Sequence, residues 1–227
     1  MVRVKFCGFT NLEDAIAAIE LGADLLGFNF YRASPRGISP ADCRTIVQGL
    51  GGALARVGRP VRLVGVFVNH PPQEVRAILE HCGLHLAQLS GDEPAEDLQH
   101  IGPAAFKAVR LARGASLEQA IANLPPRQGE PAFLIDAAVP GHYGGTGHMT
   151  DWRQARLAAR YFPLLLAGGL TPENAADAAA TVQPWGLDVA SGIENAPGKK
   201  DSRKMAAFVA AVKTTADGSS RRKVEDR

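Results

Sequence analysis

The stretch VKFCGFTNLEDAIAAIELGADLLGFN, residues 4–29, contains a strand, a helix and a second strand in close succession. The short apolar run 4–7 predicts a buried strand. Thr10 and the acidic residues that follow it predict a helix start, and Gly22 predicts the helix end. The apolar run 25–29 begins almost at once. The stretch therefore predicts two neighbouring parallel strands joined by a helix.

The same strand and helix pattern repeats along the rest of the chain. Later helices also begin at Ser or Thr next to Pro or acidic residues, as at Ser39-Pro40 and Thr171-Pro172-Glu173. Eight repeats in 227 residues predict an α/β fold, a single-domain (β/α)8 TIM barrel. A doubly wound open sheet is the alternative, because the sequence alone does not show closure. The predicted strands cover residues 4–7, 25–29, 63–68, 86–89, 106–109, 133–136, 164–167 and 187–191.

Residues 1–213 are expected to form the TIM-barrel catalytic domain, and residues 214–227 a polar, disordered C-terminal tail. The tail is basic, but the body has no basic stripe with interleaved aromatic residues, so we expect no nucleic-acid partner. The glycine-rich residues 49–53 are predicted to form a loop on the helix face.

The composition is typical of a soluble globular protein, with 46% hydrophobic and 21% charged residues and a net charge of +2. The apolar runs are too short to span a bilayer, and the N-terminus does not have the pattern of a secretory signal. We therefore expect a cytoplasmic protein without a membrane partner. The three cysteines show no CxxC spacing and no nearby pair of histidines, which argues against a disulfide framework or a zinc site.

Glycine-rich loops follow the last three predicted strands. They contain Gly145 and Gly147, then Gly168 and Gly169, then Ser191 and Gly192. In (β/α)8 barrels the loops after strands seven and eight commonly bind phosphate through backbone N–H groups. Each pair alone is compatible with an ordinary turn, but three successive loops favour a phosphorylated ligand. Lys199 and Lys200, beside Pro197-Gly198, are expected to be solvated and are left out of the site.

Cys7 and Asp136 end the first and sixth predicted strands, so the fold places both at the same rim of the barrel. Cys7 alone is compatible with a small apolar filler. Together, a thiolate and a protonated carboxyl can remove a proton from carbon and give one to oxygen. This chemistry requires the pKa of the thiol to fall toward neutrality and the pKa of the carboxyl to rise.

Three further polar residues are candidates for substrate binding. Arg36 follows the second strand, where a guanidinium can hold a carboxylate through two hydrogen bonds, although an exposed loop arginine is equally compatible. Gln88 ends the fourth strand and serves either the barrel interior or the pocket. Asp188 lies inside the eighth strand, where an inward carboxylate needs a donor from another side chain or from ligand hydroxyls.

In combination, these segments resemble the phosphoribosylanthranilate isomerase family over residues 2–213. The Lys-x-Cys-Gly-x-Thr opening and the GGTG segment followed by Asp-Trp are specific together. The segments that carry the resemblance are Lys5-Phe6-Cys7-Gly8-Phe9-Thr10, Gln88 to Glu93, Gly144-Gly145-Thr146-Gly147 with Asp151-Trp152, Ala167-Gly168-Gly169-Leu170, and Gly186 to Glu194.

The resemblance implies a TIM barrel of tryptophan biosynthesis that needs no metal or organic cofactor. It implies an Amadori rearrangement of N-(5-phosphoribosyl)anthranilate to 1-(2-carboxyphenylamino)-1-deoxyribulose 5-phosphate. The family's general base falls on Cys7, its general acid on Asp136 and its ligand for the anthranilate carboxylate on Arg36. The implied enzyme acts on a small phosphorylated substrate, as a monomer or a homodimer.

Several positions depart from the family pattern without removing the acid or the base. Phe6 and Phe9 replace smaller aliphatic residues, and Ala190 stands where Ser is common. Ser90 stands where His is common and Thr150 where Phe is common, so we expect changes in pocket polarity and in the packing around Trp152.

Two other functions are compatible with part of the pattern. A neighbouring aldose-ketose isomerase, or a barrel that forms indole-glycerol phosphate, would share the phosphate loops. The related sugar isomerases of histidine biosynthesis typically carry Asp at the end of the first strand, however, where this chain has Cys7. A barrel that binds a sugar phosphate or serves as a scaffold without catalysis is the third alternative.

Overall fold

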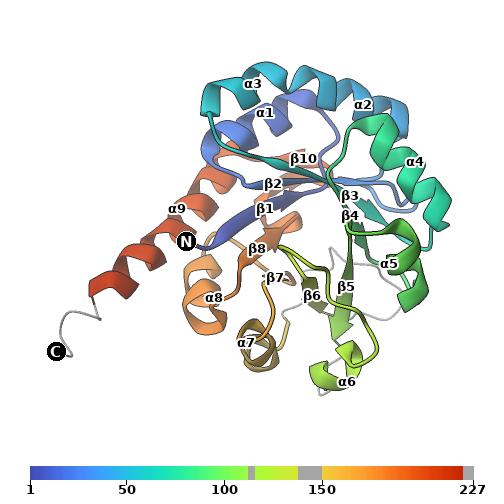
Figure 1. Ribbon diagram of the computed structural model, residues 1–227. Coiled ribbons are helices and arrows are strands. Elements are labelled where there is room, and N and C mark those ends of the chain that lie inside the picture. The colour runs from blue at the N-terminus through green and yellow to red at the C-terminus, as the bar shows by residue number, and fades with distance from the viewer. Residues whose placement is uncertain (112–115, 138–149, 222–227) are drawn as a thin grey trace.

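The computed structural model describes residues 1–111, 116–137 and 150–221, with side chains as far as residue 214 (Figure 1). Eight parallel strands form a closed barrel in chain order, and the first strand pairs with the eighth. The predicted TIM barrel is confirmed, and the open-sheet alternative is wrong. The barrel strands are β1 Arg3–Cys7, β2 Leu25–Asn29, β3 Arg62–Phe67, β4 Leu86–Leu89, β5 Ala105–Leu111, β6 Phe133–Ala137, β7 Leu164–Leu166 and β8 Gly186–Val189.

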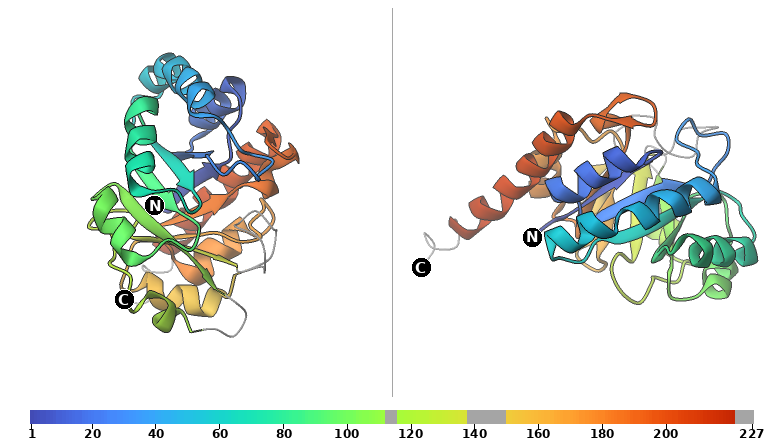
Figure 2. Two further views of the ribbon diagram at one scale, coloured as in Figure 1. Left: turned by 90° about the vertical axis from the view of Figure 1, so that its right-hand side faces the viewer. Right: turned by 90° about the horizontal axis from the view of Figure 1, so that it is seen from above.

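Helices surround the barrel, and a small hairpin follows its last strand (Figures 1 and 2). The last helix packs against the first helix and against the helix before β8, and its far end extends beyond the barrel. The helices are α1 Leu12–Leu21, α2 Pro40–Gly49, α3 Gly51–Val57, α4 Pro72–Cys82, α5 Ala95–Ile101, α6 Leu117–Ile121, α7 Trp152–Ala159, α8 Ala175–Val182 and α9 Ser202–Arg221. The hairpin consists of β9 Glu194–Ala196 and β10 Lys199–Lys200, preceded by the 3-10 turn η1 Ser191–Ile193.

The alternation of side chains along β1 decides which residues enter the site. Phe6 points outward and packs edge-on against Phe208 of α9, with ring centroids 5.9 Å apart. Its neighbours Lys5 and Cys7 therefore point into the barrel. Below them, an apolar cluster that includes Phe106 closes the barrel interior. The site thus lies at the carboxyl ends of the strands, where the apolar filling ends.

The glycine-rich stretch 49–53 is not the predicted loop. Gly49 ends α2 and Gly51 begins α3, so most of the stretch is helical. Leu50 is fully buried, Ala53 is nearly so, and α3 packs against α1. Burial of this apolar face outweighs the cost of glycine in a helix, which is about 1 kcal/mol per residue.

The helix caps differ in detail from the prediction. Asn11, not Thr10, caps α1, because its side chain accepts a hydrogen bond from the Asp14 N–H. Thr10 instead donates to the carbonyl of Gly198 at 2.6 Å and ties the β9–β10 hairpin to β1. Gly22 ends α1 in the left-handed conformation, as predicted, with φ of 114°. Within the described ranges, no helix has the length and apolar character that crossing a membrane requires.

Candidate active site

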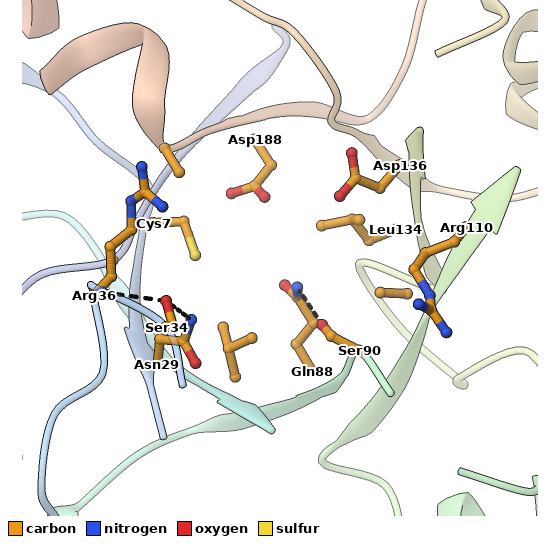
Figure 3. A pocket seen from close by; sticks show the side chains of 14 residues that line it. Cys7, Asn29, Ser34, Arg36, Gln88, Ser90, Arg110, Leu134, Asp136 and Asp188 are labelled. Carbon is orange, nitrogen blue, oxygen red and sulfur yellow. Dashed lines mark hydrogen bonds between the residues drawn. The ribbon is translucent and has the colours of Figure 1, made fainter. Parts of the chain in front are cut away.

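One pocket at the carboxyl ends of the strands brings together five of the predicted site residues (Figure 3). Cys7, Arg36, Gln88, Asp136 and Asp188 all line it. They come from β1, the loop after β2, β4, β6 and β8. Figure 3 shows Cys7 and Asp136 on opposite sides of the pocket, with Asp188 between them. The closed barrel therefore joins residues that are far apart in the sequence.

Cys7 lies at the end of β1, with its sulfur above Gly27 of β2. A Cβ atom at Gly27 would lie 2.7 Å from Cys7 Sγ and 3.2 Å from Lys5 Nζ. Because Gly27 has no side chain, Cys7 Sγ and Lys5 Nζ can occupy the space above it. Burial raises the pKa of the Cys7 thiol, the charges of Lys5 and Lys200 lower it, and the net shift is upward. The expectation that this pKa falls toward neutrality is wrong.

Asp136 faces the same pocket from β6. Its Oδ1 accepts a hydrogen bond from the Ala137 N–H at 2.8 Å. Burial raises the pKa of Asp136 to about 6, against the lowering effects of the Ala137 N–H and of the Lys5 charge. The predicted upward shift is confirmed. A carboxyl with this pKa retains a protonated fraction near neutral pH and can act as a general acid.

Arg36 is held by Glu194 in a two-pronged ion pair. Its Nε donates to Glu194 Oε1 at 2.9 Å and its Nη2 donates to Oε2 at 2.7 Å. The hydrogen bonds to Glu194 are the main reason why the pKa of Arg36 is raised. This geometry fixes the plane of the guanidinium at the pocket wall.

Lys200 is not solvated, contrary to the prediction, whereas its neighbour Lys199 is exposed. The Lys200 side chain is fully buried and donates to Glu194 Oε1 at 2.7 Å. It also donates to the carbonyl of Cys7 at 2.5 Å. Two cations thus share the single carboxylate of Glu194, and the group formed by Arg36, Glu194 and Lys200 carries one net positive charge. Such a group favours an anionic part of a ligand.

Lys5 and Asp188 form a buried ion pair at the centre of the site. The parallel pairing of β1 with β8 places the two residues side by side, and Lys5 Nζ donates to Asp188 Oδ1 at 2.8 Å. The Lys5 side chain is fully buried. Asp188 therefore has the side-chain donor that its inward position requires.

Gln88 points into the pocket and offers an acceptor. Its Nε2 donates to Ser90 Oγ at 3.0 Å, while its buried Oε1 has no hydrogen-bond partner in the part of the chain that the structure describes. An unpaired buried acceptor costs about 1–3 kcal/mol, so this oxygen favours a ligand that brings a hydroxyl or N–H donor. Ser90 also lines the pocket, which places the family departure at this position within the site.

The loops after β7 and β8 approach each other closely. Gly168 and Gly169 both have positive φ angles, of 91° and 62°. A Cβ atom at Gly192 would lie 2.0 Å from the carbonyl oxygen of Leu170, so only glycine permits this contact. The exposed Ser191 begins the turn η1 beside it. The predicted residues Gly145 and Gly147 lie outside the described residues.

Thr150 contacts the loop after β7, which like Ser191 and Gly192 does not line the pocket. Its hydroxyl donates to the carbonyl of Ala167 at 2.8 Å and lies against Gly168. The neighbouring Trp152 packs against the apolar core, and its indole N–H is buried without a hydrogen-bond partner in the described ranges. Across those ranges, no group of three His, Cys, Asp or Glu side chains is arranged to hold a metal ion.

Sequence reasoning missed the pocket-lining residues Asn29, Ser34 and Arg110. It also missed Lys5, Glu194, Lys200 and Gly27, which contact the predicted site residues. Lys5 lies two residues before Cys7, so strand alternation alone indicates that both share one face. Glu194 and Lys200 have no comparable signal, because their roles depend on contacts with Arg36 and with the backbone of Cys7. The role of Gly27 likewise depends on a contact between strands, because the side chains of Lys5 and Cys7 on β1 lie over this residue of β2.

Comparisons with known proteins agree with one another. A family model described as N-(5'phosphoribosyl)anthranilate (PRA) isomerase matches residues 4–211. The N-(5'-phosphoribosyl)anthranilate isomerase of Geobacter sulfurreducens is 43% identical over 210 residues, which cover 92% of this chain and 97% of the relative.

Solved structures give the same result. Phosphoribosyl anthranilate isomerase from Thermus thermophilus superposes with a TM-score of 0.80 at 37% identity, covering 94% of this chain and 99% of that one. A phosphoribosyl anthranilate isomerase in complex with reduced 1-(o-carboxyphenylamino)-1-deoxyribulose 5-phosphate gives 0.74 at 36% identity, covering 94% and 100%. The chain therefore belongs to the N-(5'-phosphoribosyl)anthranilate isomerase family.

Proposed function

We propose that this chain converts N-(5-phosphoribosyl)anthranilate to 1-(2-carboxyphenylamino)-1-deoxyribulose 5-phosphate in tryptophan biosynthesis, with Cys7 as general base and Asp136 as general acid. The observation that carries the assignment of roles is the placement of a thiol and a carboxyl of raised pKa across one pocket (Figure 3). The reaction needs an acid at the ring oxygen of the sugar and a base at C2, the carbon next to C1. The pocket supplies one of each.

The steps follow from these two positions. Asp136 gives its proton to the ribose ring oxygen as the bond from that oxygen to C1 breaks, which opens the ring to an iminium ion. The Cys7 thiolate then removes the proton from C2, and the C–H electron pair forms an enolamine. The enolamine then takes up a proton at C1 from the Cys7 thiol and gives the proton of its C2 hydroxyl to the Asp136 carboxylate, which yields the ketone and restores both side chains. Electrons and protons balance within the substrate and the two side chains, so the step needs no redox cofactor.

The remaining site residues suit the ends of this substrate. The group of Arg36, Glu194 and Lys200 carries one net positive charge, which suits the anthranilate carboxylate. The backbone at Gly168 and Gly192 suits the phosphate, as do the predicted residues Gly145, Gly147, Gly169 and Ser191. Gln88 Oε1 and Asp188 are acceptors for the sugar hydroxyls.

The activity is tested by the loss of anthranilate-type fluorescence when freshly generated phosphoribosylanthranilate meets the purified protein. Loss of fluorescence, together with product of the expected mass, supports the proposal. Binding of a reduced product analogue without any turnover would instead support a barrel that only binds sugar phosphates. Turnover of another phosphosugar, with none of this one, would favour a neighbouring isomerase.

Gly27→Ala is expected to lower kcat by about tenfold to hundredfold, because a displacement of about 1 Å in a reacting group can cost that much. The new methyl group would overlap Cys7 Sγ and crowd Lys5 Nζ. The matched control is Gly51→Ala, where nothing lies within 4 Å of the added Cβ. Steady-state kinetics of both variants check the prediction, and equal kcat values would contradict it.

We infer that the protein works in the cytoplasm on a small phosphorylated substrate, without nucleic-acid or membrane partners. Phosphorylated intermediates do not cross a bilayer freely, so an enzyme that uses them is expected beside the enzymes that make them. A monomer and a homodimer are both compatible with the proposal. The division into a catalytic domain of residues 1–213 and a tail of residues 214–227 stays a prediction.

A further inference from the structure

We propose that Lys5 is a positioning residue for the general base: its buried ammonium, held in place by Asp188, stabilises the thiolate form of Cys7. The inference rests on the proposed function, because it concerns the residue that acts as base there. It assigns a role to a buried cation that the proposed steps leave without one.

The geometry places the ammonium against the thiol. Lys5 and Cys7 alternate with Phe6 on β1 and point to the same side of the sheet. Lys5 Nζ and Cys7 Sγ both lie over Gly27, in the space that a side chain there would fill. The 2.8 Å hydrogen bond to Asp188 Oδ1 fixes the far side of the ammonium. The cation is thus anchored on one side and faces the sulfur on the other.

The charge of Lys5 persists in this position. Burial alone would favour the neutral amine, but the charge of Asp188 and the Cys7 thiol outweigh burial, and the pKa of Lys5 is raised. A fixed positive charge beside sulfur in a site of low dielectric favours the thiolate over the thiol. Lys5 is the strongest of the influences that lower the pKa of Cys7, and burial is the influence that it opposes.

The other charges around the thiol make Lys5 necessary. Asp188 of β8 faces the same sulfur and disfavours its negative form, while Lys200 of β10 favours it. Arg36 is close enough to Cys7 for the two charges to interact, but the Arg36 guanidinium is already paired with the Glu194 carboxylate. If Lys5 were absent, the Asp188 carboxylate would have lost its ion-pair partner, and its negative charge would repel the Cys7 thiolate. Lys5 therefore increases the fraction of Cys7 that is in the thiolate form at a given pH.

A second buried pair gives a matched comparison within the same fold. Lys107 of β5 pairs with Glu93 in the loop after β4, and both side chains are buried. Neither residue lines the pocket. Loss of the Lys107 charge is expected to affect stability in the same manner as loss of the Lys5 charge, but it should not affect the thiol. The two lysines therefore separate an electrostatic role from a structural one.

The experiment measures the pH dependence of alkylation of Cys7 by iodoacetamide, followed by mass spectrometry of the peptide that contains it. Cys43 and Cys82 are buried, so their protection in the same samples shows that each protein is folded. The variants are Lys5→Met, the double variant Lys5→Met/Asp188→Asn and the control Lys107→Met. The double variant removes the ion pair as a whole, so neither partner is left buried and unpaired.

We expect the apparent pKa of Cys7 to rise by about one unit in Lys5→Met, so that alkylation at a fixed pH below it slows about tenfold. The rise should be smaller in the double variant, because loss of the Asp188 charge removes an influence that raises this pKa. Lys107→Met should alkylate within about twofold of the wild type. A folded Lys5→Met variant with the wild-type pH dependence would overturn the proposal, as would an equal shift in Lys107→Met or a folded double variant in which the pKa of Cys7 falls below that of the wild type. The alkylation assay does not depend on turnover. If the wild-type protein failed to convert substrate, the proposed function would be refuted, but the measured effect of Lys5 on the pKa of Cys7 would still hold.

Discussion

Asp136→Asn is expected to lower kcat by about 10²–10⁴-fold, the usual contribution of general acid catalysis. Asn has nearly the shape of Asp and keeps a hydrogen-bonding oxygen, but it has no proton to give to the ribose ring oxygen. KM should change much less, because the proposed binding groups are elsewhere in the pocket. Steady-state kinetics check this, and a kcat within threefold of the wild type would contradict the assignment of the acid.

The pH dependence gives a second signature of the same residue. The pKa of Asp136 is raised to about 6, and that of Cys7 is also raised. The reactive form, a thiolate with a protonated carboxyl, is a tautomer of the form in which Cys7 holds the proton. The wild-type kcat/KM should therefore be flat between two limbs, one near pH 6 and one at the alkaline pKa of the thiol. In Asp136→Asn the limb near pH 6 should vanish, and the residual activity should rise with pH.

Stability separates a catalytic defect from misfolding in this variant. Asp136 is protonated in both states below pH 3.8, and its burial then carries no charge penalty. Above pH 6 it is ionised in both states, and the rise in its pKa corresponds to a penalty of up to about 3 kcal/mol in the folded state. Asp136→Asn lacks this penalty, so denaturant unfolding at pH 8 should show it to be more stable than the wild type. Its advantage should shrink as the pH falls from about 6 to about 4 and should be absent below that.

Cys7→Ala is expected to lower kcat by a comparable factor of about 10²–10⁴, because it removes the only proposed acceptor for the C2 proton. Substrate deuterated at C2 should show a primary isotope effect on any residual turnover, since proton removal then limits the rate. The matched control is Cys43→Ala, a fully buried cysteine of α2 outside the pocket. It should cost stability and leave kcat unchanged. An active Cys7→Ala enzyme would show that another group is the base.

The sequence was sufficient for the alternation of strands and helices and for the position of Cys7 and Asp136 at strand ends, because both depend on local patterns. Each strand is a short apolar run that ends in turn residues, and Cys7 and Asp136 stand where two such runs stop. The local pattern gave a wrong prediction at residues 49–53. The glycines there predicted a loop, but the stretch is mostly helical and buries Leu50.

The electrostatic partners could not be predicted in the same way. Lys5 and Asp188 are 183 positions apart, and Arg36 and Glu194 are 158 apart. These pairs exist because closure brings β1 beside β8 and the loop after β2 beside the final hairpin. The direction of the pKa shift of Cys7 depends on the balance between burial and these neighbours, so it too required the folded structure.

The most direct test of the central claim, that Cys7 and Asp136 act as base and acid on one substrate, is a single side-by-side measurement. Loss of anthranilate-type fluorescence is followed for the wild type, Cys7→Ala and Asp136→Asn at equal concentration and saturating phosphoribosylanthranilate. We predict rapid conversion by the wild type and a rate at least about 100-fold lower in each folded variant. Conversion at the wild-type rate by either variant, or no conversion by the folded wild type, would contradict the claim.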